Sequence, residues 1–230
     1  MQSPAFSVQV ALRYLAAHNI SLKFSNDGAW KLGKTTFQPL TAHTSGYQSI
    51  DASGHQILLN YRTQRSLQKF VPQVTLTEVL VGKINPSTVN NKIILIGTTA
   101  ESFQDYSSTP YITNEGAIEK IPGVILQAQM ISQLLGAALD GRSLLWAWSV
   151  WQEIIWIWGW SITGSLLAWY VRPLFYLGIA TSIAIASLYG VCFVILIQCS
   201  AWIPLVPSAI ALISSIILIA YWIKDFSHSA

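Results

Sequence analysis

A block of 80 residues near the carboxyl end, from Leu144 to Ile223, contains only two charged side chains, Glu153 and Arg172. A charge at the centre of a lipid bilayer costs roughly 2.5 to 3.5 kcal/mol on insertion scales, so charges are scarce where a chain crosses lipid. A soluble fold has no comparable reason to exclude charge over this length. The block therefore predicts a membrane-embedded region, with the lipid bilayer as its partner.

The first 142 residues have a different composition, with 11 Lys/Arg and 8 Asp/Glu spread evenly along them. A segment of this length is large enough to form a hydrophobic core. Its net charge of +3 is too weak and too dispersed to indicate a nucleic-acid partner. We therefore predict a soluble domain at residues 1–142, a membrane region at residues 143–223 and a short tail at residues 224–230.

The membrane region divides into three predicted helices, because Arg172-Pro173 and Gln198-Cys199-Ser200 interrupt it. Each helix is close to the 20 residues needed to cross a hydrocarbon layer roughly 30 Å thick. The predicted spans are approximately residues 151–171, 174–197 and 203–223.

Small residues recur every fourth position in the second span, at Gly178, Ser182, Ala186 and Gly190. Small side chains allow close contact between helices in a membrane. The stripe is therefore expected either to pack inside the three-helix unit or to form a contact face for a second copy of the chain.

The orientation follows from basic residues in short loops, which stay in the cytoplasm. Arg172 in the first link and Lys224 in the tail lie on the same side if there are three spans. We therefore expect a multi-pass protein of the inner cell membrane, with the soluble domain outside and the carboxyl terminus in the cytoplasm. Residues 1–19 lack the pattern of a signal peptide, so either another span upstream starts export or the orientation is reversed, and we favour the upstream span.

Helix-like and strand-like segments alternate in residues 1–142, which predicts an α/β domain. The first predicted helix is Met1–Asn19, which has Ser3 as its cap and Phe6, Val10, Tyr14 and Ala17 on one side. A short second helix begins with the capping box Thr75–Glu78 and ends at Gly82. The third covers residues 122–139 and is stopped by Gly141. The predicted strands are a hairpin over residues 20–32 with its turn at Asn26-Asp27-Gly28, a strand at residues 56–61, and a strand buried on both faces at Lys92–Ile96.

Three segments of the soluble part form distinctive sequence motifs. They are Ile57-Leu58-Leu59-Asn60-Tyr61-Arg62; Lys92-Ile93-Ile94-Leu95-Ile96-Gly97-Thr98-Thr99-Ala100 followed by Asp105 and Thr109-Pro110; and Ile121-Pro122-Gly123-Val124 followed by Gln127-Ala128-Gln129 and Gln133-Leu134-Leu135. In these segments and their order the chain resembles the CHASE2 family, the extracytoplasmic sensor domains of bacterial, often cyanobacterial, receptors. Three spans after the domain add to the resemblance.

The resemblance implies a mixed α/β sheet with helices, of which this sequence carries the carboxyl-terminal part, followed by an all-α three-helix membrane unit. It also implies an upstream span with a further outside segment, and a histidine kinase, nucleotide cyclase or protein kinase after the spans. We expect this chain to lack its own output domain. The resemblance further implies a His after Pro-Gly-Val-x-(Ile/Val/Leu), where this chain has Gln127.

Loops at the carboxyl ends of strands line the ligand crevice of open α/β sheets, which makes the loop after Ile96 a candidate site. Its amides and hydroxyls can hold an anion or form a tight turn, and it is not a P-loop because no Gly-Lys-Ser/Thr follows. Asp105 can contact a ligand or hold the loop, and Arg62 can pair with Asp105 or bind a carboxylate. The predicted ligand-binding residues are Asn60, Arg62, Gly97, Thr98, Thr99 and Asp105.

The sequence contains no HExxH, GxSxG or CxxC motif, and its histidines have no metal-ligand spacing. We therefore predict no enzymatic activity, no metal and no cofactor. A membrane-bound hydrolase using Asp105 and a histidine is the weakest hypothesis.

The pairing of an outside domain with membrane spans favours a sensor module. An unknown extracytoplasmic small molecule would shift the packing of the spans and act through a homodimer or a separate signalling protein. The alternatives are a structural membrane protein that assembles through its spans and a non-functional remnant of a split receptor gene.

Overall fold

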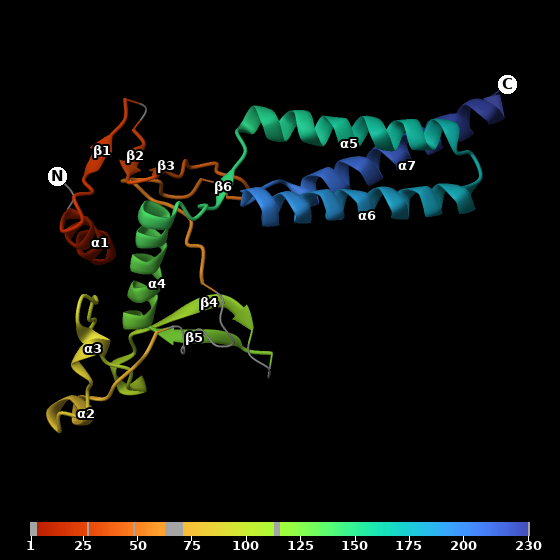
Figure 1. Ribbon diagram of the computed structural model, residues 1–230. Helices are drawn as coiled ribbons and strands as arrows, with labels where there is room; N and C mark the ends of the chain where they lie inside the picture. The colour runs from red at the N-terminus through yellow and green to blue at the C-terminus, as the bar shows by residue number, and fades with distance from the viewer. Residues whose placement is uncertain (1–3, 27, 48, 63–70, 113–115, 230) are drawn as a thin grey trace. The chain divides into compact units, whose positions relative to one another are not determined.

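The computed structural model describes residues 4–26, 28–47, 49–62, 71–112 and 116–229 (Figure 1). It divides into two compact units, which are described separately below. Unit 1 comprises residues 1–38 and 59–142, and unit 2 comprises residues 39–58 and 143–230. Unit 1 contains short helices and two small antiparallel sheets, whereas unit 2 contains three long helices.

Helix α1 (Phe6–Ala16) confirms the predicted amino-terminal helix, although its buried face differs from the predicted one. The buried residues are Ser7, Ala11 and Leu15, and the Ser7 hydroxyl donates to Met130 Sδ on α4 (Gly123–Leu135) at 3.6 Å. The predicted stripe starting at Phe6 is not the buried face: Phe6 is 56% exposed, while Val10 and Tyr14 are partly buried. Two small side chains on the inner face let the helix approach α4 closely. The proposed cap, Ser3, lies outside the described residues.

Strands β1 (Leu22–Phe24) and β2 (Trp30–Leu32) form the predicted hairpin, with Phe24 opposite Trp30. Asp27 of the predicted turn lies outside the described residues. A third strand, β3 (Thr35–Phe37), pairs with β2 and was not predicted. Gly33 joins β2 to β3 with φ +57°, and its Cα approaches the Ala138 carbonyl too closely for any side chain.

Helix α4 (Gly123–Leu135) continues into a π-helical turn, η3 (Gly136–Asp140), and stops at Gly141, whose φ is +70°. This confirms the predicted helix at residues 122–139 and its glycine stop. Ile125, Ala128 and Ile131 are buried on its inner side, as apolar residues at helical spacing should be. Two amides, Gln129 and Gln133, are buried with them at 1% and 3% exposure.

The predicted strand at residues 56–61 is not a strand in the structure. Its end is held by the buried glutamines of α4: the backbone N–H of Asn60 donates to Gln133 Oε1 at 2.9 Å, and that of Arg62 donates to Gln129 Oε1 at 3.0 Å. Gln129 Nε2 also donates to the Arg62 carbonyl at 3.4 Å. Side-chain amides therefore satisfy the backbone groups that a neighbouring strand would otherwise pair.

The predicted buried strand at Lys92–Ile96 is also wrong. The segment is neither helix nor strand, and Ile94 and Ile96 are 62% and 96% exposed. No strand pairs with it in the described part of the chain. An apolar run becomes a central strand only where strands lie on both sides of it, and unit 1 provides none here.

The remaining elements of unit 1 are short. Strands β4 (Tyr106–Ile112) and β5 (Ile118–Pro122) form a bulged antiparallel hairpin that leads directly into α4. Helix α2 (Leu76–Leu80) opens with the predicted capping box, in which Thr75 and Glu78 bond each other, and Gly82 follows with φ +69°. Helix α3 (Pro86–Val89) and the 3₁₀ turn η2 (Glu101–Phe103) precede β4.

Unit 2 contains α5 (Val150–Tyr170), α6 (Leu174–Cys199) and α7 (Leu205–Ser229), which match the positions of the three predicted spans. Among the described residues, two helices are long and apolar enough to cross a membrane: Leu174–Cys199 and the Leu205–Asp225 portion of α7. Helix α5 is 21 residues long, but its five tryptophans, Gln152 and Glu153 lower its hydropathy. Length and composition therefore support two spans.

Helices α5 and α7 pack closely through small residues. A Cβ on Gly164 would lie 2.5 Å from the Leu212 carbonyl oxygen, and the hydroxyls of Ser161 and Ser215 are 2.7 Å apart. Around this contact Ala168, Leu177, Leu212 and Ile216 form a buried cluster. By contrast, Gly178 and Gly190 of the predicted stripe face open space, so the stripe does not pack inside the three-helix unit.

The ends of the long helices are tied together by short strands. β6 (Trp146–Ala147) pairs in parallel with β7 (Ala201–Trp202), and Trp146 Nε1 donates to the Cys199 carbonyl at 2.9 Å. The Tyr47 ring contacts Trp202 edge to face, with centroids 6.0 Å apart. The segment 39–58 thereby belongs to the same unit as the long helices.

Candidate functional site

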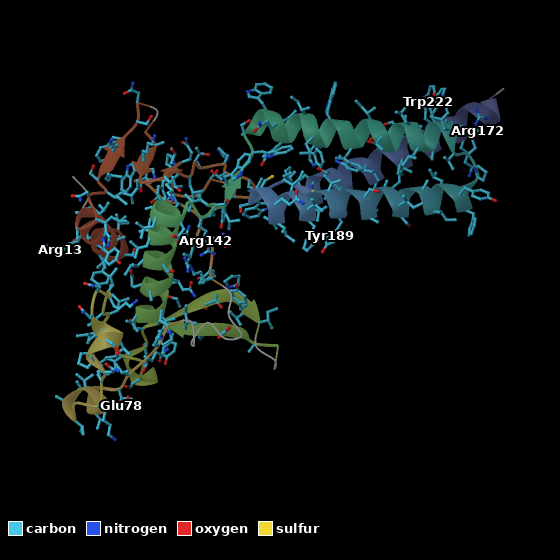
Figure 2. The ribbon with its side chains drawn as sticks, viewed as in Figure 1. Arg13, Glu78, Arg142, Arg172, Tyr189 and Trp222 are labelled. Atoms are coloured by element: carbon cyan, nitrogen blue, oxygen red, sulfur yellow. The ribbon has the colours of Figure 1, made fainter. Side chains whose placement is uncertain are left out.

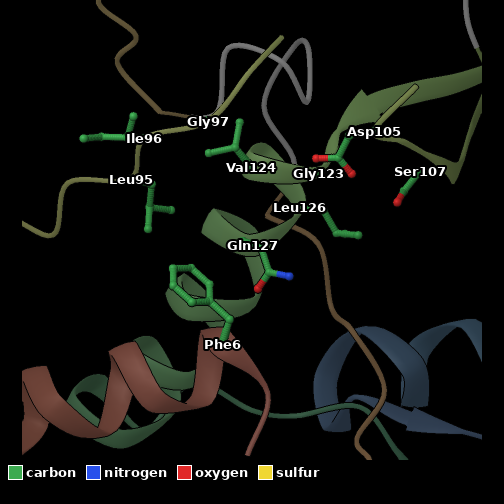
Figure 3. Close-up of a pocket in the computed structure, with 10 residues that line it drawn as sticks. All are labelled: Phe6, Leu95, Ile96, Gly97, Asp105, Ser107, Gly123, Val124, Leu126 and Gln127. Atoms are coloured by element: carbon green, nitrogen blue, oxygen red, sulfur yellow. The ribbon is translucent and has the colours of Figure 1, made fainter. Parts of the chain in front are cut away.

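A cavity of about 290 Å³ lies in unit 1 beside the first turns of α4 (Figure 3). This volume is at the small end of the range for ligand sites, so it suits a small metabolite. Figure 3 shows Val124, Leu126 and Gln127 projecting from α4 around it. The lining residues are Phe6, Leu95, Ile96, Gly97, Asp105, Ser107, Gly123, Val124, Leu126 and Gln127.

Two glycines allow the walls of this cavity to meet. A Cβ on Gly97 would lie 2.6 Å from Val124 Cβ, and one on Gly123 would lie 2.5 Å from both carboxylate oxygens of Asp105. The Gly123 N–H donates to the Asp105 carbonyl at 2.9 Å. These contacts hold the loop after Ile96 and the start of β4 against the amino-terminal end of α4.

The polar lining of the cavity offers hydrogen-bond acceptors. The Asp105 carboxylate lies over the amino-terminal end of α4, where the helix dipole stabilises negative charge. Gln127 Oε1 is buried and has no hydrogen-bond partner among the described residues, and the Ser107 hydroxyl is partly buried. None of the ten residues that line the cavity is basic. A negative carboxylate at this helix end opposes the binding of an anion, which the sequence had suggested for this loop.

The predicted site residues separate into two groups. Gly97 and Asp105 line the same cavity, whereas Asn60 and Arg62 are bonded through their backbone to the carboxyl-terminal half of α4. A Cβ on Gly136 would lie 2.5 Å from Arg62 Nη2, so the Arg62 guanidinium lies beside Gly136. Gly136 is thirteen residues along the helix from Gly123, which contacts Asp105. At about 1.5 Å per residue the two ends are roughly 20 Å apart, so the predicted pair between Arg62 and Asp105 does not form.

Thr98 and Thr99 are exposed and do not line the cavity. The Thr99 carbonyl accepts a hydrogen bond from the Tyr106 hydroxyl at 2.7 Å. This bond ties the loop to the start of β4, so the backbone of Thr99 has a structural role here.

Arg62 has a cationic neighbour that sequence reasoning missed. Arg142 Cδ would lie 3.7 Å from a Cβ on Gly136, so both side chains reach the same turn, and Figure 2 labels Arg142 near the end of α4. Burial first, and then the Arg62 charge, lower the pKa of Arg142. Basic residues are common just after a helix, so the position of Arg142 in the sequence did not indicate that Arg62 lies beside it.

The sequence carried a signal for the other missed residues. Gln127, Gln129 and Gln133 are amide side chains within a mostly apolar helix, and buried polar groups usually have a hydrogen-bond partner. Gln129 and Gln133 bind the backbone of residues 60–62, and Gln127 lines the cavity. In the described residues, no group of three or more His, Cys, Asp or Glu side chains could hold a metal ion.

Comparison with known proteins identifies the family. The family model for the CHASE2 domain matches residues 1–166 of the 230, which is more than half of the chain. Neither the curated proteins nor the solved structures contain a match. The match covers all of unit 1, including the cavity and the Gly97 loop. The chain therefore belongs to the CHASE2 family, a family of sensor domains in signal transduction.

Proposed function

We propose that the chain is the membrane-anchored sensor module of a bacterial receptor, with the cavity beside α4 as its ligand site. One observation carries this proposal: a ligand-sized cavity lies within the CHASE2 match and is lined by Gly97 and Asp105. A concave site with a few convergent polar groups among apolar walls is typical of small-molecule recognition. The same chain continues into helices suited to a bilayer.

The lining of the cavity defines the chemistry of the proposed ligand. The Asp105 carboxylate, Gln127 Oε1 and the Ser107 hydroxyl can all accept hydrogen bonds, while Phe6, Leu95 and Leu126 supply apolar contacts. A buried acceptor without a partner gains most from a ligand that donates a hydrogen bond. The ligand is therefore a small cation, above all an ammonium, that carries a short apolar portion.

The experiment uses the full chain in lipid nanodiscs and isoamylamine as the probe. Calorimetric titration should detect saturable binding of the amine, with weaker binding of isoamyl alcohol and none of isovalerate. Asp105→Asn and Gln127→Leu should each weaken amine binding about tenfold, the value of one charge-assisted or buried hydrogen bond.

Glu119→Gln is the matched control, because it removes a carboxylate of unit 1 that does not line the cavity. It should bind the amine as the wild type does. Equal binding of amine, alcohol and carboxylate, or equal affinity in Asp105→Asn, would exclude the proposed ligand class.

We propose that α5, α6 and α7 all cross the inner membrane, so that unit 1 is extracytoplasmic and Lys224 lies in the cytoplasm. The apolar lengths of α6 and α7 support two of these spans, and the aromatic residues Trp151 and Trp169 near the ends of α5 suit the two membrane interfaces. A reporter active only in the cytoplasm should give signal when fused to Ala230 and none when inserted within residues 198–200. The reverse pattern would invert the topology.

The proposed mechanism is a shift between two packings of the spans, without catalysis. A ligand changes such an equilibrium only by binding one packing more tightly than the other. The signal would pass to a second copy of the chain or to a separate signalling protein. Hydrogen–deuterium exchange of α5–α7 should change when isoamylamine saturates the cavity, and should not change in Asp105→Asn.

A further inference from the structure

The carboxyl-terminal end of α4 brings together two arginine side chains from different segments. A Cβ on Gly136 would lie 2.5 Å from Arg62 Nη2 and 3.7 Å from Arg142 Cδ, so both side chains converge on one turn. Both residues are anchored there through their backbone: Arg62 N–H donates to Gln129 Oε1 at 3.0 Å, and Arg142 N–H donates to the Gly136 carbonyl at 3.0 Å. The convergence is therefore built into the fold.

The two guanidinium groups have buried nitrogens without acceptors. Arg62 Nε and Arg142 Nη1 are both buried and have no hydrogen-bond partner within the described part of the chain. Guanidinium groups stay protonated in proteins, so the pair cannot relieve its repulsion by losing a proton. Both side chains are partly buried, and a buried N–H donor without an acceptor is unfavourable, so this turn has donors that lack an acceptor among the described residues.

Among the residues that the structure describes, the groups near this turn do not supply an acceptor for these donors. The carbonyl of Ala137 accepts from Thr35 Oγ1 at 2.6 Å, and that of Ala138 accepts from the Lys34 N–H at 3.1 Å. The aliphatic part of Lys34 lies near Gly141 and adds a third cation to this end. Asp140 is the acidic residue of the turn η3, and it is exposed.

We propose that Arg62 and Arg142 together bind a phosphate-type oxyanion at the carboxyl-terminal end of α4. A guanidinium group presents a planar fork of N–H donors that binds such oxygens in pairs. A tetrahedral anion offers enough oxygen atoms for both groups. The site is separate from the cavity at the other end of the helix and does not depend on the ligand proposed there.

Two sources carry this chemistry. One is a free phosphate-bearing molecule. The other is a lipid headgroup, because Arg142 lies two residues before the low-charge block that begins at Leu144.

The test measures the unfolding midpoint of the full chain in micelles of a neutral detergent, with inorganic phosphate titrated against sodium chloride at equal ionic strength. Phosphate should raise the midpoint of the wild type and should bind about tenfold more weakly to Arg62→Gln and to Arg142→Gln. Without phosphate, both variants should be at least as stable as the wild type, because each removes half of a repelling pair. Arg13→Gln is the matched control: it removes an exposed arginine of α1 and should respond to phosphate as the wild type does.

A lipid arm separates the two sources. The unfolding midpoint is measured without phosphate in nanodiscs of phosphatidylglycerol and of phosphatidylcholine. If phosphatidylglycerol raises the midpoint of the wild type more than that of Arg142→Gln, the anion is a lipid headgroup. A response to inorganic phosphate alone identifies a free ligand.

If a glutamine variant fails to fold, Arg142→Lys replaces it. Phosphate binding is then measured directly by the broadening of the phosphorus NMR line. This change keeps the charge and loses the fork, so weaker broadening in the folded variant supports the site. The proposal is overturned if phosphate affects the wild type and a variant carrying both Arg62→Gln and Arg142→Gln equally, or if the wild type responds to neither source.

Discussion

Helix α4 buries two polar side chains, whereas helix α6 exposes large apolar side chains. Gln129 and Gln133 are buried in unit 1 and hold the backbone of a neighbouring segment. In α6, Phe175 and Ile183 are 75% and 62% exposed. Leaving one large apolar side chain in water costs about 1.5 to 3 kcal/mol, and α6 exposes many of them. The contrast supports the proposal that the two units face different solvents, water around unit 1 and lipid around α6.

The largest expected effect comes from placing one charge on an exposed isoleucine in each unit. Ile183 of α6 and Ile118 of β5 are almost equally exposed, at 62% and 61%. If α6 faces lipid, Ile183→Asp should reduce membrane insertion by about 3 kcal/mol, while Ile118→Asp should change stability by less than about 0.5 kcal/mol. Glycosylation-site mapping measures the insertion of Ile183→Asp, and thermal unfolding measures the stability of Ile118→Asp. Normal insertion of Ile183→Asp would remove the contrast between the units.

The next effect tests how helices pack in unit 2. Gly164→Val would push a side chain into the Leu212 carbonyl oxygen and should cost about 3 kcal/mol, the upper end for overpacking. Gly178→Val is its control, because the space around Gly178 is open. Unfolding in detergent should show a large loss for the first variant and little change for the second. Similar losses in both would mean that helix propensity, and not close packing, determines the result.

A smaller effect tests the buried amides of unit 1. Gln129→Leu should destabilise the domain by about 2 kcal/mol, because it leaves the Arg62 N–H without its acceptor. Gln127→Leu is the matched control on the same helix: its Oε1 has no partner among the described residues, so its loss should be neutral or slightly stabilising. Denaturant unfolding of the full chain compares them. An equal loss for both would show that the amide contacts contribute little.

Local features of the fold could be predicted from the sequence. The capping box at Thr75, the hairpin of β1 and β2, and the end of α4 at Gly141 depend on residues that are neighbours along the chain. The strands predicted at residues 56–61 and Lys92–Ile96 are wrong, because a strand forms only where a partner strand elsewhere in the chain pairs with it. The first segment found glutamine side chains, and the second has no paired strand in the described residues.

The candidate site was predictable in part for the same reason. Gly97 and Asp105 are close in sequence, and both line the cavity. Arg62 was expected beside Asp105, but its position is determined by Gln129 and by Gly136, which are remote in sequence. Gln127 stood in a recognisable motif without a role, and the cavity lining supplies one.

The smallest expected effect compares the helix starts of the two units at low pH. In α2, Glu78 accepts hydrogen bonds from the Thr75 N–H and hydroxyl at 2.8 and 2.9 Å, and these bonds lower the pKa of Glu78. In α5 the equivalent acceptor is neutral: Gln152 Oε1 takes the Ser149 N–H at 2.9 Å.

Because the pKa of Glu78 is lower in the folded state than in the unfolded state, its contribution to stability is complete above the unfolded-state pKa. That contribution is lost as pH falls through the folded-state pKa. The Thr75 amide resonance should therefore shift in an acid titration, with a midpoint below the ordinary glutamate range, while the Ser149 amide stays constant. Glu78→Gln should make the first start as insensitive to pH as the second. A Thr75 shift that persists in Glu78→Gln would assign the titration to another group and remove this difference between the units.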